Sequence, residues 1–121
     1  MIENVETGLG KSMIALEDID EGIMVNYLGM CARDGEFARG ISAYNVSIGE
    51  QFIIYTNNEA LLLAGDDFDL NDKGFKELTC DSFGRGVPAN IGEYVNAIAL
   101  SNGFFNNFVK VEVVSIPYLK K

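Results

Sequence analysis

Short runs of β-branched and aromatic residues alternate with turn residues along most of the chain. Residues 109–113 alternate apolar and polar positions strictly, which is typical of a strand with one face in water. No segment keeps a 3.6-residue apolar period over three turns, and the one helix candidate, 57–65, also suits a buried strand. The pattern predicts an all-β fold, either a small barrel or a sandwich of the β-tulip type. Four runs have the length and composition of strands: 23–28, 52–56, 94–100 and 108–116.

Glycine marks the expected turns and occurs 13 times. Asp34-Gly35 and Asn102-Gly103 are hairpin signals, because Asp-Gly and Asn-Gly tolerate the positive φ angles of a type I′ turn. We therefore expect the chain to reverse at both places.

A seven-residue pattern recurs within the chain. Residues 37–43 and 83–89 share Phe, Arg, Gly and Ala at matching places, and Ile-Gly-Glu follows each copy. An acidic, glycine-containing cluster also precedes each copy. Such internal similarity predicts two tandem half-units. We place these pseudo-repeats at about 14–60 and 61–114, inside a single β domain that spans 13–121.

Residues 1–12 differ from the rest, because they are polar or flexible with isolated apolar positions. We expect an N-terminal arm that either frays or becomes ordered on a partner. Gly8-Leu9-Gly10-Lys11-Ser12 does not form a phosphate loop, since Val5 stands where that motif requires glycine and no strand precedes it. The apolar residues that the arm could offer to a partner are Ile2, Val5 and Leu9.

The composition limits the classes of function that the chain can have. The chain has 121 residues and a formal charge of −9, which argues against nucleic acid as a partner because phosphate binding requires clustered Lys and Arg. No apolar run approaches the length of a membrane span, and the start lacks the basic region of a secretory signal. We expect a soluble domain made inside a cell, with Cys31 and Cys80 unpaired.

Catalytic and metal sites are not expected. The chain has no histidine to serve as a base, and no serine stands in a Ser-x-x-Lys pattern, so we predict that it is not an enzyme and holds no cofactor. Residues 67–72 carry alternate carboxylates like the start of a calcium loop. However, Asp72 and Leu78 occupy the places that need Gly and Glu, so a solvated acidic strand face is favoured over a metal site.

Arg39 and Arg85 occupy matching places in the repeat and are candidate interface residues. Each arginine either packs its stem on the sheet and pairs with a loop carboxylate, such as Glu50 or Glu93, or it contacts another subunit. The phenylalanines that follow the Asn-Gly step form either part of the core or an exposed patch for self-association. The most prominent of them are Phe104 and Phe105.

The order of acidic clusters, turns and short glycine-containing steps along the chain resembles that of the small capsid decoration (cement) proteins of tailed bacteriophages. The similarity lies in repeated Gly-Val-Ala and Gly-Glu or Gly-Asp steps, and it covers roughly 14–114. The resemblance implies a β-rich structural protein on the outside of the expanded head, made in the bacterial host cytoplasm. It implies a homotrimer that bridges neighbouring major capsid subunits, without a role for nucleic acid or membrane, and an arm that orders on the capsid. The steps are Ala-Gly-Asp at 64–66, Gly-Val-Pro-Ala at 86–89 and Ile-Gly-Glu at 91–93.

Two other classes of function fit the sequence. A tail or baseplate domain of a virion would have a similar β pattern. A carbohydrate-binding or receptor-binding module would need exposed aromatic residues, which in a chain without tryptophan are tyrosine or phenylalanine. The tyrosines available for such a face are Tyr27, Tyr44, Tyr55, Tyr94 and Tyr118.

Overall fold

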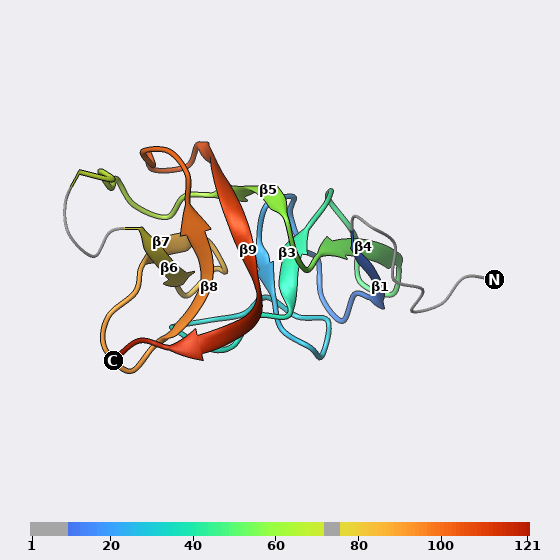
Figure 1. Ribbon diagram of the computed structural model, residues 1–121. Helices are drawn as coiled ribbons and strands as arrows, with labels where there is room; N and C mark the ends of the chain where they lie inside the picture. Colours follow the sequence, from blue (N-terminus) through green and yellow to red (C-terminus); the bar gives the residue numbers. More distant parts are fainter. Residues whose placement is uncertain (1–9, 72–75) are drawn as a thin grey trace.

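The computed structural model describes residues 10–71 and 76–121, which form two antiparallel sheets (Figure 1). No described residue is helical and neither sheet closes on itself, so the all-β prediction is confirmed in its sandwich form. None of the described residues forms a helix that could cross a membrane. The first sheet has the order β1 (Lys11–Ile14), β4 (Gln51–Tyr55), β3 (Gly40–Ser42), β2 (Met24–Val25). The second has the order β5 (Glu59–Leu63), β9 (Phe108–Leu119), β8 (Tyr94–Ala99), β6 (Glu77–Cys80), β7 (Gly86–Pro88).

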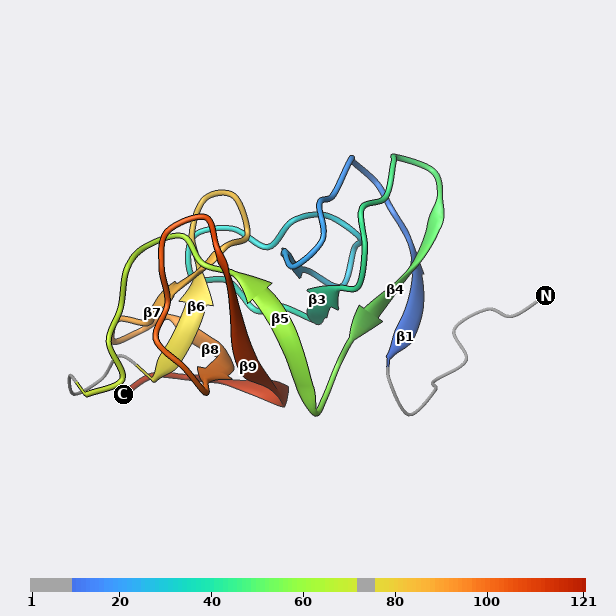
Figure 2. The same cartoon turned by 90° about the horizontal axis from the view of Figure 1, so that it is seen from above.

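The chain passes from one sheet to the other between β4 and β5, which meet at a sharp angle (Figure 2). Asn58 has a positive φ of 62° in this connection. The helix alternative for 57–65 is wrong, because β5 is an extended strand with Ala60 and Leu62 buried and Leu61 exposed. The alternation predicted for 109–113 is confirmed, since its three valines are buried and its Lys and Glu are exposed.

Two hydrophobic clusters stabilise the fold, and β2 contributes to both. Met24 belongs to a cluster that joins the two sheets, whereas its neighbour Val25 belongs to a cluster confined to the N-terminal half. The two residues differ in this way because successive side chains of a strand point to opposite faces. The first cluster includes Ile41, Leu62, Leu78 and Val111. The second includes Ile19, Ile23, Phe52 and Ile54.

The buried amide of Asn96 ties the two halves together. Its Oδ1 accepts the N–H of Ala38 at 2.9 Å, and its Nδ2 donates to the carbonyl of Glu36 at 3.0 Å. Both bonds satisfy backbone groups at the edge of the core, where an unpaired polar group is costly, and the Glu36 carbonyl also accepts the thiol of Cys80.

One five-residue turn occurs twice, at 26–30 and 81–85. The Oδ1 atom of the first residue, Asn26 or Asp81, accepts the N–H groups of the third and fifth residues at 2.8–3.1 Å. The fourth residue is glycine in both turns and has a φ of 93° at Gly29 and 79° at Gly84, which favours glycine. The second of these turns contains Phe83 and Arg85, two residues of the candidate interaction surface.

The two Ile-Gly-Glu steps form matching turns at 47–50 and 90–93, as the repeat predicts. In each turn the Glu Oε1 accepts the N–H of the first residue at 2.8 Å. A third turn of this kind, at 33–36, contains Asp34-Gly35, whose φ angles of 52° and 82° confirm the predicted turn. It does not directly join two paired strands, because it lies inside the long connection between β2 and β3, so the hairpin prediction is wrong here. Arg39 and Arg85 each immediately precede a strand, β3 and β7 (Gly86–Pro88), but only Arg85 closes a side-chain-capped turn. The half-unit boundaries and the domain range 13–121 stay predictions.

The hairpin predicted at Asn102-Gly103 is wrong. Gly103 instead pairs with Phe68 through two backbone hydrogen bonds of 2.9 and 3.0 Å, and a Cβ at this glycine would overlap the Phe68 ring. The chain reverses at 104–107, where Asn106 has a φ of 63°. This turn brings the exposed ring of Phe105 beside Arg85 of the 81–85 turn.

Candidate interaction surface

Arg85 is held rigidly at the surface by groups from two turns. Its Nε donates to Asp81 Oδ2 at 2.9 Å, and its Nη1 donates to Asn106 Oδ1 at 3.0 Å. The Cζ atom of the guanidinium lies 5.0 Å from the ring centroid of Phe83 and 5.1 Å from that of Phe105. These are distances at which a cation is attracted to an aromatic face. The guanidinium therefore fixes both rings in place.

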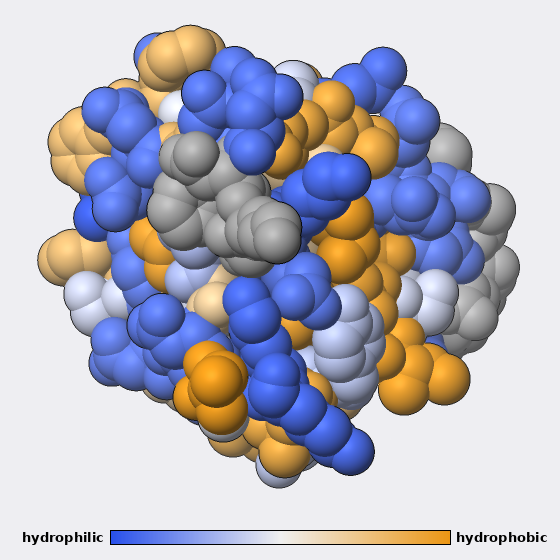
Figure 3. All heavy atoms as spheres, turned by 60° about the vertical axis from the view of Figure 1, so that its left-hand side comes forward, coloured by the Kyte–Doolittle hydropathy of each residue, from blue (hydrophilic) through white to orange (hydrophobic). Residues whose placement is uncertain are grey.

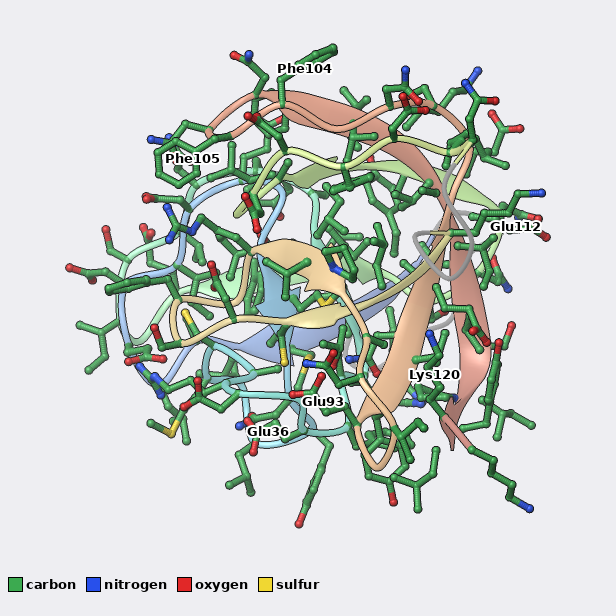
Figure 4. All side chains as sticks on the ribbon, turned by 90° about the vertical axis from the view of Figure 1, so that its left-hand side faces the viewer. Glu36, Glu93, Phe104, Phe105, Glu112 and Lys120 are labelled. Atoms are coloured by element: carbon green, nitrogen blue, oxygen red, sulfur yellow. The ribbon has the colours of Figure 1, made fainter. Side chains whose placement is uncertain are left out.

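The two rings are nevertheless exposed to solvent, by 64% at Phe83 and 52% at Phe105. Phe104 is exposed by 60% and precedes Phe105 in the turn at 104–107 (Figure 4). The N–H of Phe105 donates to Asp67 Oδ1 at 2.9 Å, which anchors the turn to the loop after β5. We call these residues the aromatic–arginine surface: Phe83, Arg85, Phe104 and Phe105. Its rings are large apolar groups kept in water in a fixed geometry, as is typical of interface anchors.

A hollow of about 460 Å³ opens beside this surface. Phe83, Arg85 and Asn106 line one part of it, and three carboxylates from the segment between β1 and β2 line another. Hydrophobic and hydrophilic residues are intermixed on the side of the molecule seen in Figure 3. The carboxylates belong to Glu17, Asp18 and Asp20.

Glu17 is already engaged in the wall of this hollow. Arg33 Nη2 donates to both of its carboxylate oxygens, at 3.1 and 3.2 Å, and the N–H of Cys31 donates to Oε2 at 2.7 Å. Partial burial raises the pKa of the Glu17 carboxyl, but these hydrogen bonds outweigh it and leave the pKa below its ordinary value.

The two cysteines are free and neither is an activated thiol. Burial raises the pKa of Cys31 to about 11, and the nearby Glu17 carboxylate adds to the effect. Burial likewise raises the pKa of Cys80 to about 11. Thiols of this kind are almost fully protonated at neutral pH and react slowly.

The structure brings together only part of the predicted interface set. Arg85 and Phe105 are in contact and Phe104 is the chain neighbour of Phe105, whereas Arg39 immediately precedes β3 and forms no ion pair with any other described residue. The predicted carboxylate partner of Arg85 was Glu93, and the observed partner is Asp81. Glu93 cannot play this role because its carboxylate closes its own turn. The other predicted residues, Ile2, Val5 and Leu9, lie outside the described residues.

The tyrosines proposed for a glycan-binding face lie on different elements. Tyr94 packs edge-to-face against Phe37, with ring centroids 5.5 Å apart, and is half-buried. Tyr118 lies on β9 and donates its hydroxyl to Glu77 at 2.7 Å. These contacts are structural, so they do not support a shared tyrosine face.

Sequence reasoning missed Phe83, Asp81 and Asn106 as parts of the site. A usable signal existed, because Asn-x-x-Gly at 26–29 and Asp-x-x-Gly at 81–84 share the pattern of a side-chain-capped turn. That alignment would have placed Arg85 immediately after such a turn. Asn106 left no comparable signal, since its contact with Arg85 spans 21 residues.

The fold has a counterpart among solved structures. The N base of head fiber gp8.5 in bacteriophage phi29 superposes with a TM-score of 0.70 and covers 91% of this chain and 97% of its own. The two share a fold. Their sequences are 16% identical, so the likeness concerns the architecture alone. No protein-family model matches the sequence, and no curated protein matches it.

Proposed function

We propose that this chain is a structural virion protein that binds the outer surface of an expanded phage head and cements neighbouring major capsid subunits. The observation that carries the proposal is the fold shared with a phage head-fibre base over nearly the whole of both chains. The repeated Gly-Glu and Gly-Asp steps, which resemble those of phage decoration proteins, add independent support from the sequence. The proposed activity is binding without catalysis, as the sequence leads us to expect.

The aromatic–arginine surface is the face that we assign to the capsid. Arg85 orders the rings of Phe83 and Phe105 before binding, so these two side chains have little freedom left to lose on contact. Cementing then works by avidity, because each copy in a homotrimer at a threefold position would hold several subunits at once. A modest interface per copy suffices under these conditions.

Co-sedimentation with purified head shells from the same source tests the proposal. We expect saturable binding to expanded shells and none to unexpanded shells, with three copies per threefold site at saturation. Binding to neither form of shell would contradict the proposal and favour a tail or baseplate location.

The variant Phe104→Ser/Phe105→Ser tests the assigned face. The backbone bond from residue 105 to Asp67 is kept in this variant, so the turn should still form. Ile116→Ser is the matched control, because Ile116 is 82% exposed on the distant C-terminal half of β9. We expect the double variant to lose shell binding and the control to keep it; equal binding by the two would show that another face meets the shell.

A further inference from the structure

The charges around the hollow beside Phe83 do not cancel. Glu17 is neutralised by Arg33, and Asp81 is neutralised by Arg85. Asp18 and Asp20 line the same hollow, and neither forms an ion pair with another described residue. The wall therefore carries two negative charges that the described part of the chain leaves uncompensated.

The two carboxylates are available to a ligand to different extents. Asp18 uses Oδ1 to accept the N–H of Ile48 at 2.9 Å, which fixes its orientation and leaves Oδ2 available. No donor among the described residues bonds the Asp20 carboxylate. Asp20 instead contributes its main-chain carbonyl, which accepts the hydroxyl of Ser42. The backbone at this position is thus fixed while the side chain is not.

An aromatic face completes the hollow. Phe83 already accepts one guanidinium, that of Arg85, and still exposes most of its ring. A hollow of about 460 Å³ accommodates one long side chain but not a strand or a helix. A planar cation suits both the aromatic ring and the carboxylates of this hollow, since a guanidinium stacks on an aromatic ring while its N–H groups bond carboxylates.

We propose that this hollow binds an arginine side chain of a protein partner, with the guanidinium stacked on Phe83 and bonded to Asp18 and Asp20. The inference rests on the proposed function for the identity of the partner, which would be a capsid subunit with an arginine at the centre of an apolar contact. The aromatic–arginine surface then meets the apolar surroundings of that arginine. Lysine would be a weaker ligand, because an ammonium is a point charge that cannot form the planar fork. A phosphate-bearing partner is disfavoured by the same two carboxylates.

The variant Asp18→Asn/Asp20→Asn removes both charges and keeps the shape of the hollow. The amide introduced at position 18 would still accept the N–H of Ile48 through its Oδ1 atom, so the fold should be unaffected. Asp34→Asn/Glu112→Gln is the matched control with the same change in charge at two exposed positions, and Glu112 lies on the opposite side of the view in Figure 4 from Phe105.

The first readout uses a small probe and does not depend on any shell. Amide chemical shifts are followed while N-acetylarginine amide is added to millimolar concentrations, with N-acetylcitrulline amide as the neutral counterpart. We expect shifts confined to residues around the hollow, such as Asp20 and Phe83, with the arginine probe alone. These shifts should vanish in the Asp18→Asn/Asp20→Asn variant and persist in the control. Shifts that are absent, or that survive in the variant, would overturn the proposal.

The second readout is co-sedimentation with expanded shells, where we expect the variant to bind roughly tenfold more weakly than the control. If shells bind the variant and the control equally, the arginine proposal fails while the proposed capsid function stands. If no form of the protein binds shells but the probe titration gives the expected shifts, the proposal that the hollow binds arginine stands and the proposed capsid function fails. The two proposals can therefore fail separately.

Discussion

Replacing Arg85 by methionine tests how the aromatic–arginine surface is held in place. Methionine keeps an unbranched apolar stem that can lie between the rings of Phe83 and Phe105, but it removes every polar contact of the guanidinium. Asp81 Oδ2 and Asn106 Oδ1 then lose their donor. The turn itself should survive, because Asp81 Oδ1 still caps the backbone N–H groups at 83 and 85.

The expected loss of stability follows from these contacts. Losing a hydrogen bond to a partly buried carboxylate costs about 1.5 kcal/mol, the low end of the range for charged groups. The lost bond to Asn106 adds little, because its amide oxygen is exposed and water replaces the donor. Losing two cation–π contacts at a partly exposed site costs about 0.5 kcal/mol each. Contact of the methionine sulfur with the rings returns about 0.5 kcal/mol. The free energy of unfolding should therefore fall by about 2 kcal/mol, which for a chain of this size lowers Tm by roughly 6–10 °C.

Urea unfolding followed by far-UV circular dichroism measures this change, with Arg39→Met as the control. Arg39 occupies the matching place in the sequence repeat but forms no ion pair with any described residue, so its replacement should change the free energy of unfolding by less than about 0.5 kcal/mol. Equal losses in the two variants, or a loss below about 0.5 kcal/mol in Arg85→Met, would refute the reasoning.

Three further predictions concern other parts of the molecule. Cys31 and Cys80 should react with iodoacetamide at pH 8 far more slowly in the native protein than in urea, because burial raises both pKa values to about 11; equal rates would contradict this. Glu17→Gln should destabilise the protein above the ordinary pKa of a glutamate carboxyl and progressively less as the pH falls below it, since a carboxyl whose pKa is lowered by folding contributes stability that is lost as pH falls through that pKa; a difference that persists undiminished in acid would count against the ion pair. Gly92→Ala should cost about 1 kcal/mol in unfolding free energy from its positive φ alone. Gly103→Ala should cost several times as much because its Cβ would overlap a buried ring, and similar losses would be inconsistent with that packing.

The sequence pattern predicts the strands well where burial alternates locally. The run 109–113 shows this clearly, because its valines are buried by the same sheet that leaves Lys110 and Glu112 in water. The segment 57–65 was ambiguous, since three consecutive leucines suit a helix and a strand equally. Pairing with β9 resolves it, and that pairing joins Glu59 to Glu112 across 53 residues, beyond the reach of any local pattern.

The candidate site shows the same division between local and distant causes. The exposure of Phe104 and Phe105 could be proposed from their position after a turn, but the cause of that turn could not. Phe68 lies over Gly103 and forces the reversal three residues later than the Asn-Gly signal predicts. The repeat marks Arg85 in the sequence and the Asp-x-x-Gly step marks the capped turn, but the pairing of Arg85 with Asp81 within that turn is a feature of the folded structure.

The most direct test of the proposed function is a cryo-EM reconstruction of expanded head shells incubated with the protein. We predict β-rich density on the outer surface of the shell, with Phe83 and Phe105 facing a capsid subunit and an arginine of that subunit beside Asp18 and Asp20. Density on the outer surface with these phenylalanines facing solvent would contradict the assigned interface. A shell without added density under saturating protein would contradict the capsid function itself.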